Sequence, residues 1–300
     1  MPLKPKRRLL TALAILLALS VLLLVVAMVR LNAGPRRMAR IALDTSRAVL
    51  DSRRVRSSSQ GAYTNLVFLH QSTGANLIRE GHLRERLAES GLQLWDQGYN
   101  YLGLTDPQGN PAGYSYSVPN DRTHPTALAR IFNQREYNRP LNTFSGLLQH
   151  EVIILKSCFD PTSRIESDEQ LEEYKAAYRT IHQRMRQHPE KLFILLTQPP
   201  LNPAETDAEQ ARRARSLASW LASDEFKGDL ENLYVFDLFD RLATAEGSGS
   251  EANMLRSEYR DGADSHPNTR ANEAIALDVA TFIVQAVEEF RYKHVEPETS

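Results

Sequence analysis

Cysteine is almost absent from this sequence of 300 residues, in which Cys158 is the only thiol. A single cysteine excludes an internal disulfide framework and any metal site built from several cysteines. The eight histidines show no ligand spacing with carboxylates, so we expect no metal site, and no motif predicts a cofactor. Cys158 follows an apolar run and could be a nucleophile, but inert packing is the expectation for a lone cysteine.

Basic residues are scarce beyond the N-terminal part of the chain. Residues 1–50 contain nine Lys or Arg and one acidic residue, which leaves 27 basic and 36 acidic residues in the rest. An acidic body repels phosphate backbones at long range, so nucleic acid is not an expected partner. The basic excess instead lies where lipid headgroups would be if the N-terminal part enters a membrane.

One long apolar run, residues 9–29, contains no charge and only Thr11 and Ser20 as polar members. As a helix it would span about 30 Å, the hydrocarbon thickness of a bilayer, so we expect an uncleaved single-pass membrane anchor in residues 1–30. A cleaved signal peptide is the alternative, but the run is long for one and lacks small residues at a cleavage site. A short basic N-terminus usually stays cytoplasmic, which would place the remaining chain outside the cytoplasm, in the periplasm of a Gram-negative cell.

The rest of the chain divides into a tether at residues 31–61, with a helical part at 37–51, an α/β domain at 62–293 and a C-terminal tail at 294–300. Short apolar runs typical of buried strands occur at residues 65–69, 152–155, 192–196 and 233–236. Amphipathic helices are expected at residues 75–89, 125–135, 167–187, 208–222 and 272–292. This alternation predicts a mainly parallel sheet with right-handed helical crossovers, a three-layer α/β/α sandwich.

Residues 97–123 fit no periodic pattern and are rich in Gly, Asn, Pro, Tyr and Asp. A long irregular insertion in such a fold is often a substrate-facing loop, with disorder as the alternative. Trp95, Tyr99 and Tyr101 could stack on a sugar, although burial against the first helices is the expectation for them.

The candidate catalytic residues follow from the position of each polar segment relative to the strands. In open α/β sheets, ligands bind at the carboxyl ends of the strands. Ser72 follows the first apolar run on a strand-to-helix turn, where its hydroxyl would face the crevice. The N–H groups at that helix start, up to Gly74, could stabilise an oxyanion. Capping of the helix by the serine is the alternative.

A second polar segment, Asp264-Ser265-His266, precedes the last helix. A serine nucleophile needs a base such as His266 and a carboxylate such as Asp264 to orient it. An Asx-type turn with an incidental histidine is the alternative. For His70, beside the proposed nucleophile, we expect a supporting hydrogen bond rather than the role of base.

With a serine after the first strand and Asp and His together before the last helix, the sequence resembles the SGNH (GDSL-like) hydrolase superfamily. The resemblance covers the order of elements from about residue 65 to 290, and it implies a flavodoxin-like sheet and hydrolysis of esters. The family's Gly-Asp-Ser block is here His70-Gln71-Ser72, so only the serine is retained.

The other motifs of the family are also altered. The usual Asp-x-x-His would place Ala263 at the aspartate position, whereas Asp264 gives Asp-x-His, a spacing similar to that of some O-acetyltransferases and esterases acting on polysaccharides. Asp261 is the second candidate for orienting the histidine. The family's oxyanion Asn has no counterpart after the second apolar run, where Ser157 is the expected replacement donor, beside Gly74 and the Ser72 N–H.

These residues together predict a membrane-anchored serine ester hydrolase of the cell envelope that acts on a small-molecule or carbohydrate ester. Ser72 would attack the ester carbonyl, His266 would take and return the proton, and Asp264 would hold the imidazole tautomer. A sugar hydroxyl as acceptor in place of water would make the protein an acyltransferase. A non-catalytic binding or scaffolding protein that keeps the fold is the alternative.

Overall fold

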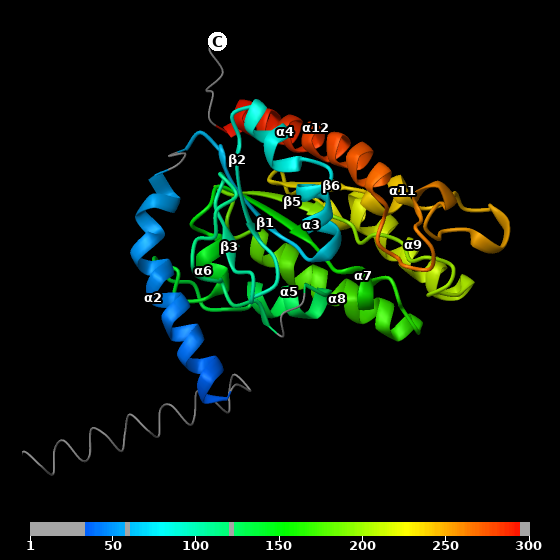
Figure 1. Cartoon of the computed structure of the whole chain (residues 1–300), viewed down its shortest axis with the longest axis horizontal. Helices are drawn as coiled ribbons and strands as arrows, with labels where there is room; N and C mark the ends of the chain where they lie inside the picture. Colours follow the sequence, from blue (N-terminus) through cyan, green and yellow to red (C-terminus); the bar gives the residue numbers. More distant parts are fainter. Residues whose placement is uncertain (1–33, 58–60, 120–122, 295–300) are drawn as a thin grey trace, which may run out of the picture. The chain divides into compact units, whose positions relative to one another are not determined.

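A computed structural model describes residues 34–57, 61–119 and 123–294 of the chain (Figure 1). The expected membrane anchor lies outside these residues, and none of the helices within them has the length and apolar character needed to cross a bilayer. The chain divides into two compact units, Met1–Asp44 and Thr45–Ser300. The second unit carries the sheet and all the candidate catalytic residues.

A six-stranded sheet forms the centre of the second unit, with the strand order β3-β2-β1-β4-β5-β6. Five strands pair in parallel, and only β3 joins the edge antiparallel to β2. The strands are β1 (Asn65–Leu69), β2 (Gln93–Gln97), β3 (Leu104–Thr105), β4 (Val152–Lys156), β5 (Leu192–Leu196) and β6 (Leu233–Phe236). The five parallel strands have the flavodoxin-like order 2-1-3-4-5, which the resemblance implied, although only four of the five were predicted from the sequence pattern.

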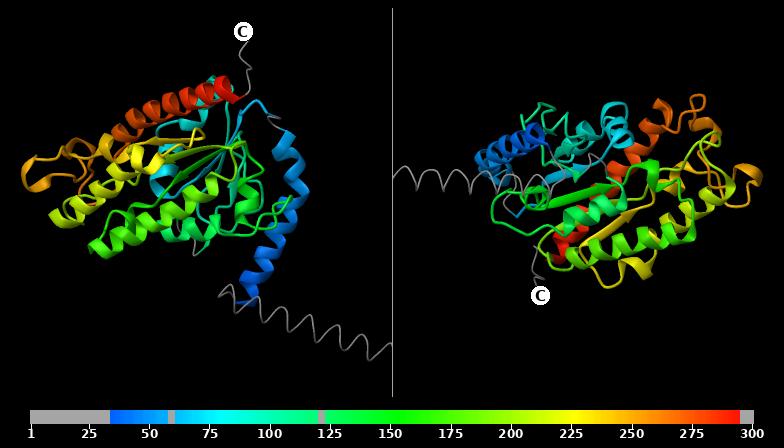
Figure 2. Two further views of the ribbon diagram at one scale, coloured as in Figure 1. Left: turned by 180° about the vertical axis from the view of Figure 1, so that it is seen from behind. Right: turned by 90° about the horizontal axis from the view of Figure 1, so that it is seen from below.

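Helices cover both faces of this sheet (Figures 1 and 2). The longer ones are α2 (Pro35–Ser57), α3 (Ser72–Arg79), α4 (Leu83–Glu89), α5 (Pro125–Phe132), α8 (Asp168–Met185), α9 (Ala208–Ala222) and α12 (Thr269–His294). Short helical segments are α6 (Thr143–Leu147), α7 (Phe159–Thr162), α10 (Asp224–Lys227), α11 (Leu238–Leu242), η2 (Gly249–Glu251) and η3 (Ser257–Tyr259). The predicted α/β/α sandwich is therefore confirmed.

The two faces of the sheet bury alternate residues of the same strands, as the pleat requires. In β1, Val67 and Leu69 face a core made with α5, α8 and α9, whereas Leu66 and Phe68 face a core made with α3, α4 and α12. All five residues of β1 are buried. Strands buried on both faces are continuous apolar runs, which is why four of them were predicted from the sequence.

The strands that the sequence did not predict are β2 and β3 at one edge of the sheet, and the short helical segments were not predicted either. Strand β2 carries Gln93, Asp96 and Gln97 among its five residues, so its composition lacks the apolar run of the other parallel strands. The expected helix at 75–89 is two helices, α3 and α4, separated by Gly81 and by His82 in the left-handed region (φ 55°). The other predicted helices are present, with ends shifted by a few residues.

The end of α2 packs on the second unit instead of running free as a linker. Val55 is buried, and its carbonyl accepts a hydrogen bond of 2.6 Å from the Asn65 side-chain amide at the start of β1. The Arg54 guanidinium lies 4.9 Å from the centre of the Trp95 ring on β2. The helical part of the predicted tether thus extends beyond residues 37–51 at both ends, and its last turns cover the edge of the sheet.

The connection between α3 and α4 packs closely against α12 at Gly81. A Cβ atom there would lie 2.5 Å from the Asn272 carbonyl oxygen, whereas a Cβ at Gly98 would meet its nearest neighbour at 3.5 Å. We predict that Gly81→Ala lowers the free energy of unfolding by about 1–3 kcal/mol, the usual effect of overpacking. Gly98→Ala should change it by less than about 1 kcal/mol in urea titrations. Equal effects of the two substitutions would contradict this packing.

Candidate active site

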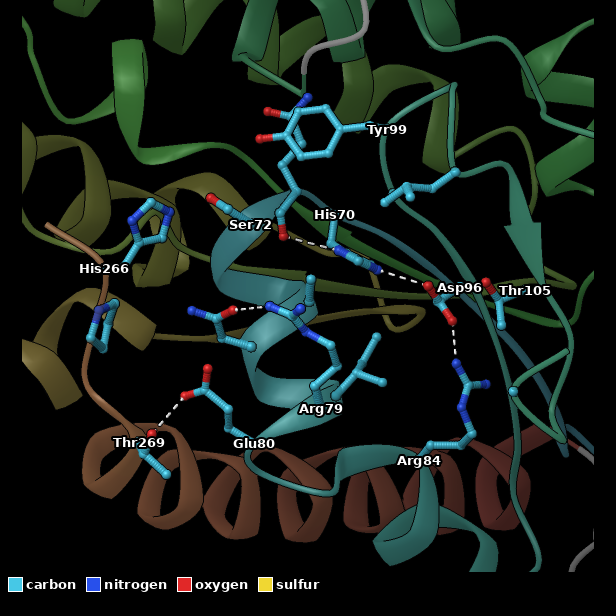
Figure 3. Close-up of a pocket in the computed structure, with 18 of the residues that line it drawn as sticks. His70, Ser72, Arg79, Glu80, Arg84, Asp96, Tyr99, Thr105, His266 and Thr269 are labelled. Atoms are coloured by element: carbon cyan, nitrogen blue, oxygen red, sulfur yellow. Dashed lines mark hydrogen bonds and ion pairs between the residues drawn. The ribbon is translucent and has the colours of Figure 1, made fainter. Parts of the chain in front are cut away.

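A pocket of about 930 Å³ opens at the carboxyl ends of β1 and β2 (Figure 3). Three segments supply its walls: residues 70–85 around α3, residues 96–111 after β2, and residues 261–269 before α12. Strand β1 lies between β2 and β4, and the strand order reverses between β1 and β4, next to this pocket. Ligand sites of open α/β sheets lie at such switch points.

Ser72 is the first residue of α3 and lines this pocket, half-buried. The N-cap position belongs to Gln71, whose backbone is extended, and no side chain caps the helix. The alternative interpretation, in which Ser72 merely caps the helix, is therefore wrong. Because the first N–H groups of a helix have no intrahelical acceptor, the Ser72 N–H and hydroxyl are both available for other partners.

His266 and Asp264 form the ion pair that the sequence predicted. The imidazole Nδ1 lies 2.8 Å and 3.0 Å from the two carboxylate oxygens of Asp264, and the His266 N–H also donates to this carboxylate at 3.1 Å. The ring of Phe159 meets the imidazole edge-on at 4.9 Å between centroids. With Nδ1 engaged by the carboxylate, Nε2 is left as the nitrogen that can exchange a proton with a substrate or nucleophile.

The pKa of Asp264 is lower than the usual value for an aspartate. Partial burial raises this pKa, but the hydrogen bonds from the side chain and backbone of His266 outweigh that effect. Asp261 also lines the pocket, yet among the described residues it has no hydrogen bond to His266. The structure therefore pairs the imidazole with Asp264 and not with the second candidate.

Ser72 and His266 line the same pocket, and in Figure 3 the serine hydroxyl points to the side on which the imidazole lies. Within the described part of the chain, no hydrogen bond joins the two side chains. Hydrogen bonds between catalytic groups are often long in unliganded enzymes and shorten when substrate binds. All three members of the predicted triad line the same pocket, but Ser72 and His266 are not hydrogen-bonded to each other.

Tyr99 covers Ser72 from the loop that follows β2 (Figure 3). Burial raises the pKa of Tyr99, while hydrogen bonding with the side chain and backbone of Ser72 lowers it in part. Its ring stacks on Tyr101, with centroids 5.7 Å apart and planes inclined by 19°. Tyr101 is 68% exposed and Trp95 only 2%, so the expected burial is correct for Trp95 and wrong for Tyr101.

The two remaining predicted residues do not face the pocket as expected. Ser157 is fully buried and does not line the pocket, which argues against its predicted role as an oxyanion donor. Gly74 is buried in the first turn of α3, where a Cβ atom would lie 2.7 Å from the His70 ring carbon Cγ. The Ser72 N–H is thus the backbone donor that the geometry favours. Cys158 is also buried and outside the lining, in agreement with inert packing.

A buried charged network behind Ser72 was not predicted as a unit. His70 Nε2 lies 3.1 Å from Asp96 Oδ1, and Arg84 donates to the other oxygen of this carboxylate (Figure 3). Burial raises the pKa of Asp96, but the hydrogen bond and charge of His70 and the charge of Arg84 outweigh it and lower this pKa. Asp96 lies on the unpredicted strand β2, so its position next to His70 could not be inferred from the sequence.

No cluster of three or more His, Cys, Asp or Glu side chains suited to a metal ion occurs among the described residues. The pocket lining includes Ser72 and Tyr99, which carry hydroxyls, the imidazole of His266 and its carboxylate partner Asp264. A hydroxyl, a base and a backbone N–H that converge on one pocket are the elements of nucleophilic acyl transfer.

No family model matches this sequence, and no curated protein matches it. The fold is similar to solved structures of hydrolases. A GDSL-like lipase from Bacteroides thetaiotaomicron is 12% identical, over 82% of this chain and 98% of the lipase, with a TM-score of 0.45. A lipase from a goat rumen metagenome is 12% identical, over 72% of this chain and 97% of the lipase, with a TM-score of 0.44. At this degree of similarity the chemistry of the chain has to be inferred from its own residues.

The lowered pKa of Asp96 predicts how stability changes with pH. A carboxylate whose pKa is lower in the folded state stabilises the fold above its unfolded pKa, and this contribution is lost as the pH falls through the folded value. We expect Asp96→Asn to lower the free energy of unfolding by about 3–5 kcal/mol at pH 7, because it leaves buried cations without their partner. The difference from wild type should shrink below pH ~4.

Urea titrations of the full-length chain between pH 7 and pH 3 measure this difference. Asp261→Asn is the matched control, since Asp261 lines the same pocket but is exposed, and it should have little effect at any pH. A difference between wild type and Asp96→Asn that stays constant down to pH 3 would show that the ionised carboxylate is not the source of the stabilisation.

Proposed function

We propose that this chain is a serine ester hydrolase of the SGNH type. The observation that carries this proposal is the Asp264–His266 pair, at 2.8 Å, in the same pocket as the first residue of α3, Ser72. Asp264 does make the Asx-type turn, because its carboxylate accepts the His266 backbone N–H at 3.1 Å, but this turn does not account for the contact of the same carboxylate with the imidazole. Serine, histidine and aspartate in this arrangement are typical of acyl transfer through a covalent intermediate.

In the proposed reaction, Ser72 Oγ attacks the ester carbonyl while His266 Nε2 accepts the serine proton. The Asp264 carboxylate accepts a hydrogen bond from Nδ1–H and stabilises the imidazolium that forms. The tetrahedral intermediate carries its negative charge near the start of α3, where the Ser72 N–H can donate to it. His266 then gives its proton to the alcohol that leaves, and water releases the acyl group by the same steps.

Carbohydrate O-acyl groups are the proposed substrate class. The Tyr99–Tyr101 stack offers an aromatic surface, and Asn76, Arg79 and Asn268 line the same pocket with polar groups. Aromatic faces with hydrogen-bonding groups beside them suit a sugar ring, whose faces are apolar and whose edges are polar. A sugar hydroxyl that intercepts the acyl-enzyme in place of water would make the protein an acyltransferase.

We further propose that the protein works in the cell envelope, held to the membrane by residues 1–30 with the domain outside the cytoplasm. The apolar run at residues 9–29 supports the anchor, and the short basic N-terminus supports the orientation. The α/β domain would then reach substrates close to the membrane surface.

A non-catalytic binding protein is the second candidate, favoured by one observation. Tyr99 lies over Ser72, which lowers the pKa of the tyrosine in part, and no hydrogen bond in the described residues joins Ser72 to His266 (Figure 3). A tyrosine that permanently covers the serine would leave a polar pocket for recognition without an active nucleophile. Reactivity of Ser72 separates the two functions.

Labelling with a fluorophosphonate probe tests the proposed function. We expect the full-length chain, purified in a mild detergent, to form an adduct that mass spectrometry locates on Ser72. Ser72→Ala should abolish the adduct, and His266→Ala should slow its formation by about 10³-fold or more, because the serine loses its base. Hydrolysis of p-nitrophenyl acetate should fall in parallel.

Ser216→Ala is the control, since Ser216 lies on α9 and its hydroxyl donates to the Arg212 carbonyl far from the pocket. This variant should label like wild type. A well-folded wild-type chain without an adduct would favour the binding protein.

A further inference from the structure

His70 is the buried residue that connects the end of β1 to the candidate nucleophile. Its side chain is about 3% exposed, and each ring nitrogen has one partner. Nδ1 lies 3.0 Å from the Gln71 carbonyl oxygen and Nε2 lies 3.1 Å from Asp96 Oδ1. A carbonyl oxygen and an ionised carboxylate can only accept hydrogen bonds. Both acceptors are satisfied only by a ring that carries a proton on each nitrogen, an imidazolium.

The counter-charge for this imidazolium is already in place. Asp96 receives hydrogen bonds from His70 on one carboxylate oxygen and from Arg84 on the other. Arg84 is tied in turn to the backbone by a hydrogen bond of 2.8 Å to the Asp106 carbonyl oxygen. All three side chains are buried, so solvent screens their charges only weakly.

The Gln71 carbonyl that His70 contacts belongs to the same peptide unit as the Ser72 N–H. A trans peptide is planar, so fixing the direction of the carbonyl also fixes the opposite direction of the N–H. The same carbonyl accepts the Ala75 N–H at 3.0 Å in the first turn of α3. Two donors, one of them charged, thus hold the Gln71 carbonyl and polarise its peptide unit, which makes the Ser72 N–H a stronger donor.

Space for the imidazole is provided by Gly74. A Cβ atom at Gly74 would lie 2.7 Å from His70 Cγ, whereas one at Gly98 would lie at an ordinary contact distance, 3.5 Å from His70 Cε1. The ring is therefore enclosed between the first turn of α3 and the end of β2, and a displaced ring would have to move one of these backbones. In Figure 3 the line of contacts runs from the carbonyl through His70 to Asp96 and Arg84.

From these contacts we propose that His70 is a positioning residue for the oxyanion donor. It holds and polarises the Gln71–Ser72 peptide so that the Ser72 N–H faces the carbonyl oxygen of the ester, and the Asp96 carboxylate, which Arg84 holds in place, favours the charged form of its ring. This role rests on the proposed hydrolase function, because it concerns the charge that develops when Ser72 attacks. His70 itself touches neither the ester nor the reacting atoms.

Kinetics of His70→Phe, with a ring of similar size but no donors, test the role. We expect kcat for p-nitrophenyl acetate to fall by about 10–100-fold with KM nearly unchanged, less than the 10²–10³-fold that follows removal of an oxyanion donor itself. His70→Gln, which retains one donor group, should recover part of the loss. An unchanged kcat, or a change in KM alone, would overturn the proposal.

His150→Phe is the matched control for the loss of a buried, doubly hydrogen-bonded histidine. His150 is fully buried at the opposite end of β1, with Nδ1 2.8 Å from Asn65 Oδ1 and Nε2 3.0 Å from the Tyr116 hydroxyl oxygen. Both Phe variants should lower stability in urea by similar amounts, but only His70→Phe should lower kcat. Equal losses of kcat in the two Phe variants would show that His70 has only a structural role.

Nuclear magnetic resonance of the full-length chain with isotope-labelled histidine tests the hydrogen bonds without any turnover. At pH 7 the His70 ring should carry protons on both nitrogens, and Asp96→Asn should leave a proton on one. A neutral ring in wild type would overturn the proposal. A chain that forms no Ser72 adduct but shows the doubly protonated ring would disprove the hydrolase function while retaining the peptide contact.

Discussion

Burial of β1 between β2 and β4 is the constraint on which the rest of the structure depends. The strand pairs in parallel on both sides and buries all of its side chains, so its direction and register are fixed by two neighbours and two cores. Because the chain leaves β1 at the point where the strand order reverses, the residues after Leu69 must cross the end of the sheet. The pocket and the first turn of α3 both follow from that crossing.

The same constraint explains why charged side chains are buried next to the site. Residues directly after β1 enter the space between α3 and the end of β2, where water is excluded. A charged group there is stable only with partners, and the His70–Asp96–Arg84 network supplies them from three elements, the end of β1, β2 and α4. Such a network fixes the relative positions of these elements more specifically than apolar packing would. That precision matters next to a nucleophile, where small displacements change rates strongly.

The sequence allowed the prediction of those features that depend on local pattern. Apolar runs identified β1, β4, β5 and β6, since a strand buried on both faces consists almost entirely of apolar residues. Asp264 and His266 were predicted as a pair because they are two residues apart, and a short turn keeps them close. Ser72 was predicted from its place after β1. These inferences needed no knowledge of long-range contacts.

Features that depend on packing between segments distant in the sequence could not be predicted from local sequence patterns. Strand β2 was missed because its polar residues serve the network and the loop instead of a core, so its alternation is lost. Ser157 follows β4 as a donor would, but the side chain points into the protein, and the sequence carries no signal for that direction. Tyr101 was expected to be buried, yet it stacks on Tyr99 at the pocket. In each case the deciding contact joins residues that only the fold brings together.

The segment His70-Gln71-Ser72 at the end of β1, which differs from the Gly-Asp-Ser pattern, has a physical explanation. A histidine has replaced the glycine of the Gly-Asp-Ser pattern, and a ring at that position needs space that a conventional side chain above it would fill. Gly74 leaves this space, and the Asp96 carboxylate supplies the negative charge opposite the ring. For the proposed hydrolase, this segment is another way of holding the peptide before Ser72, because the His70 ring lies 3.0 Å from the Gln71 carbonyl oxygen.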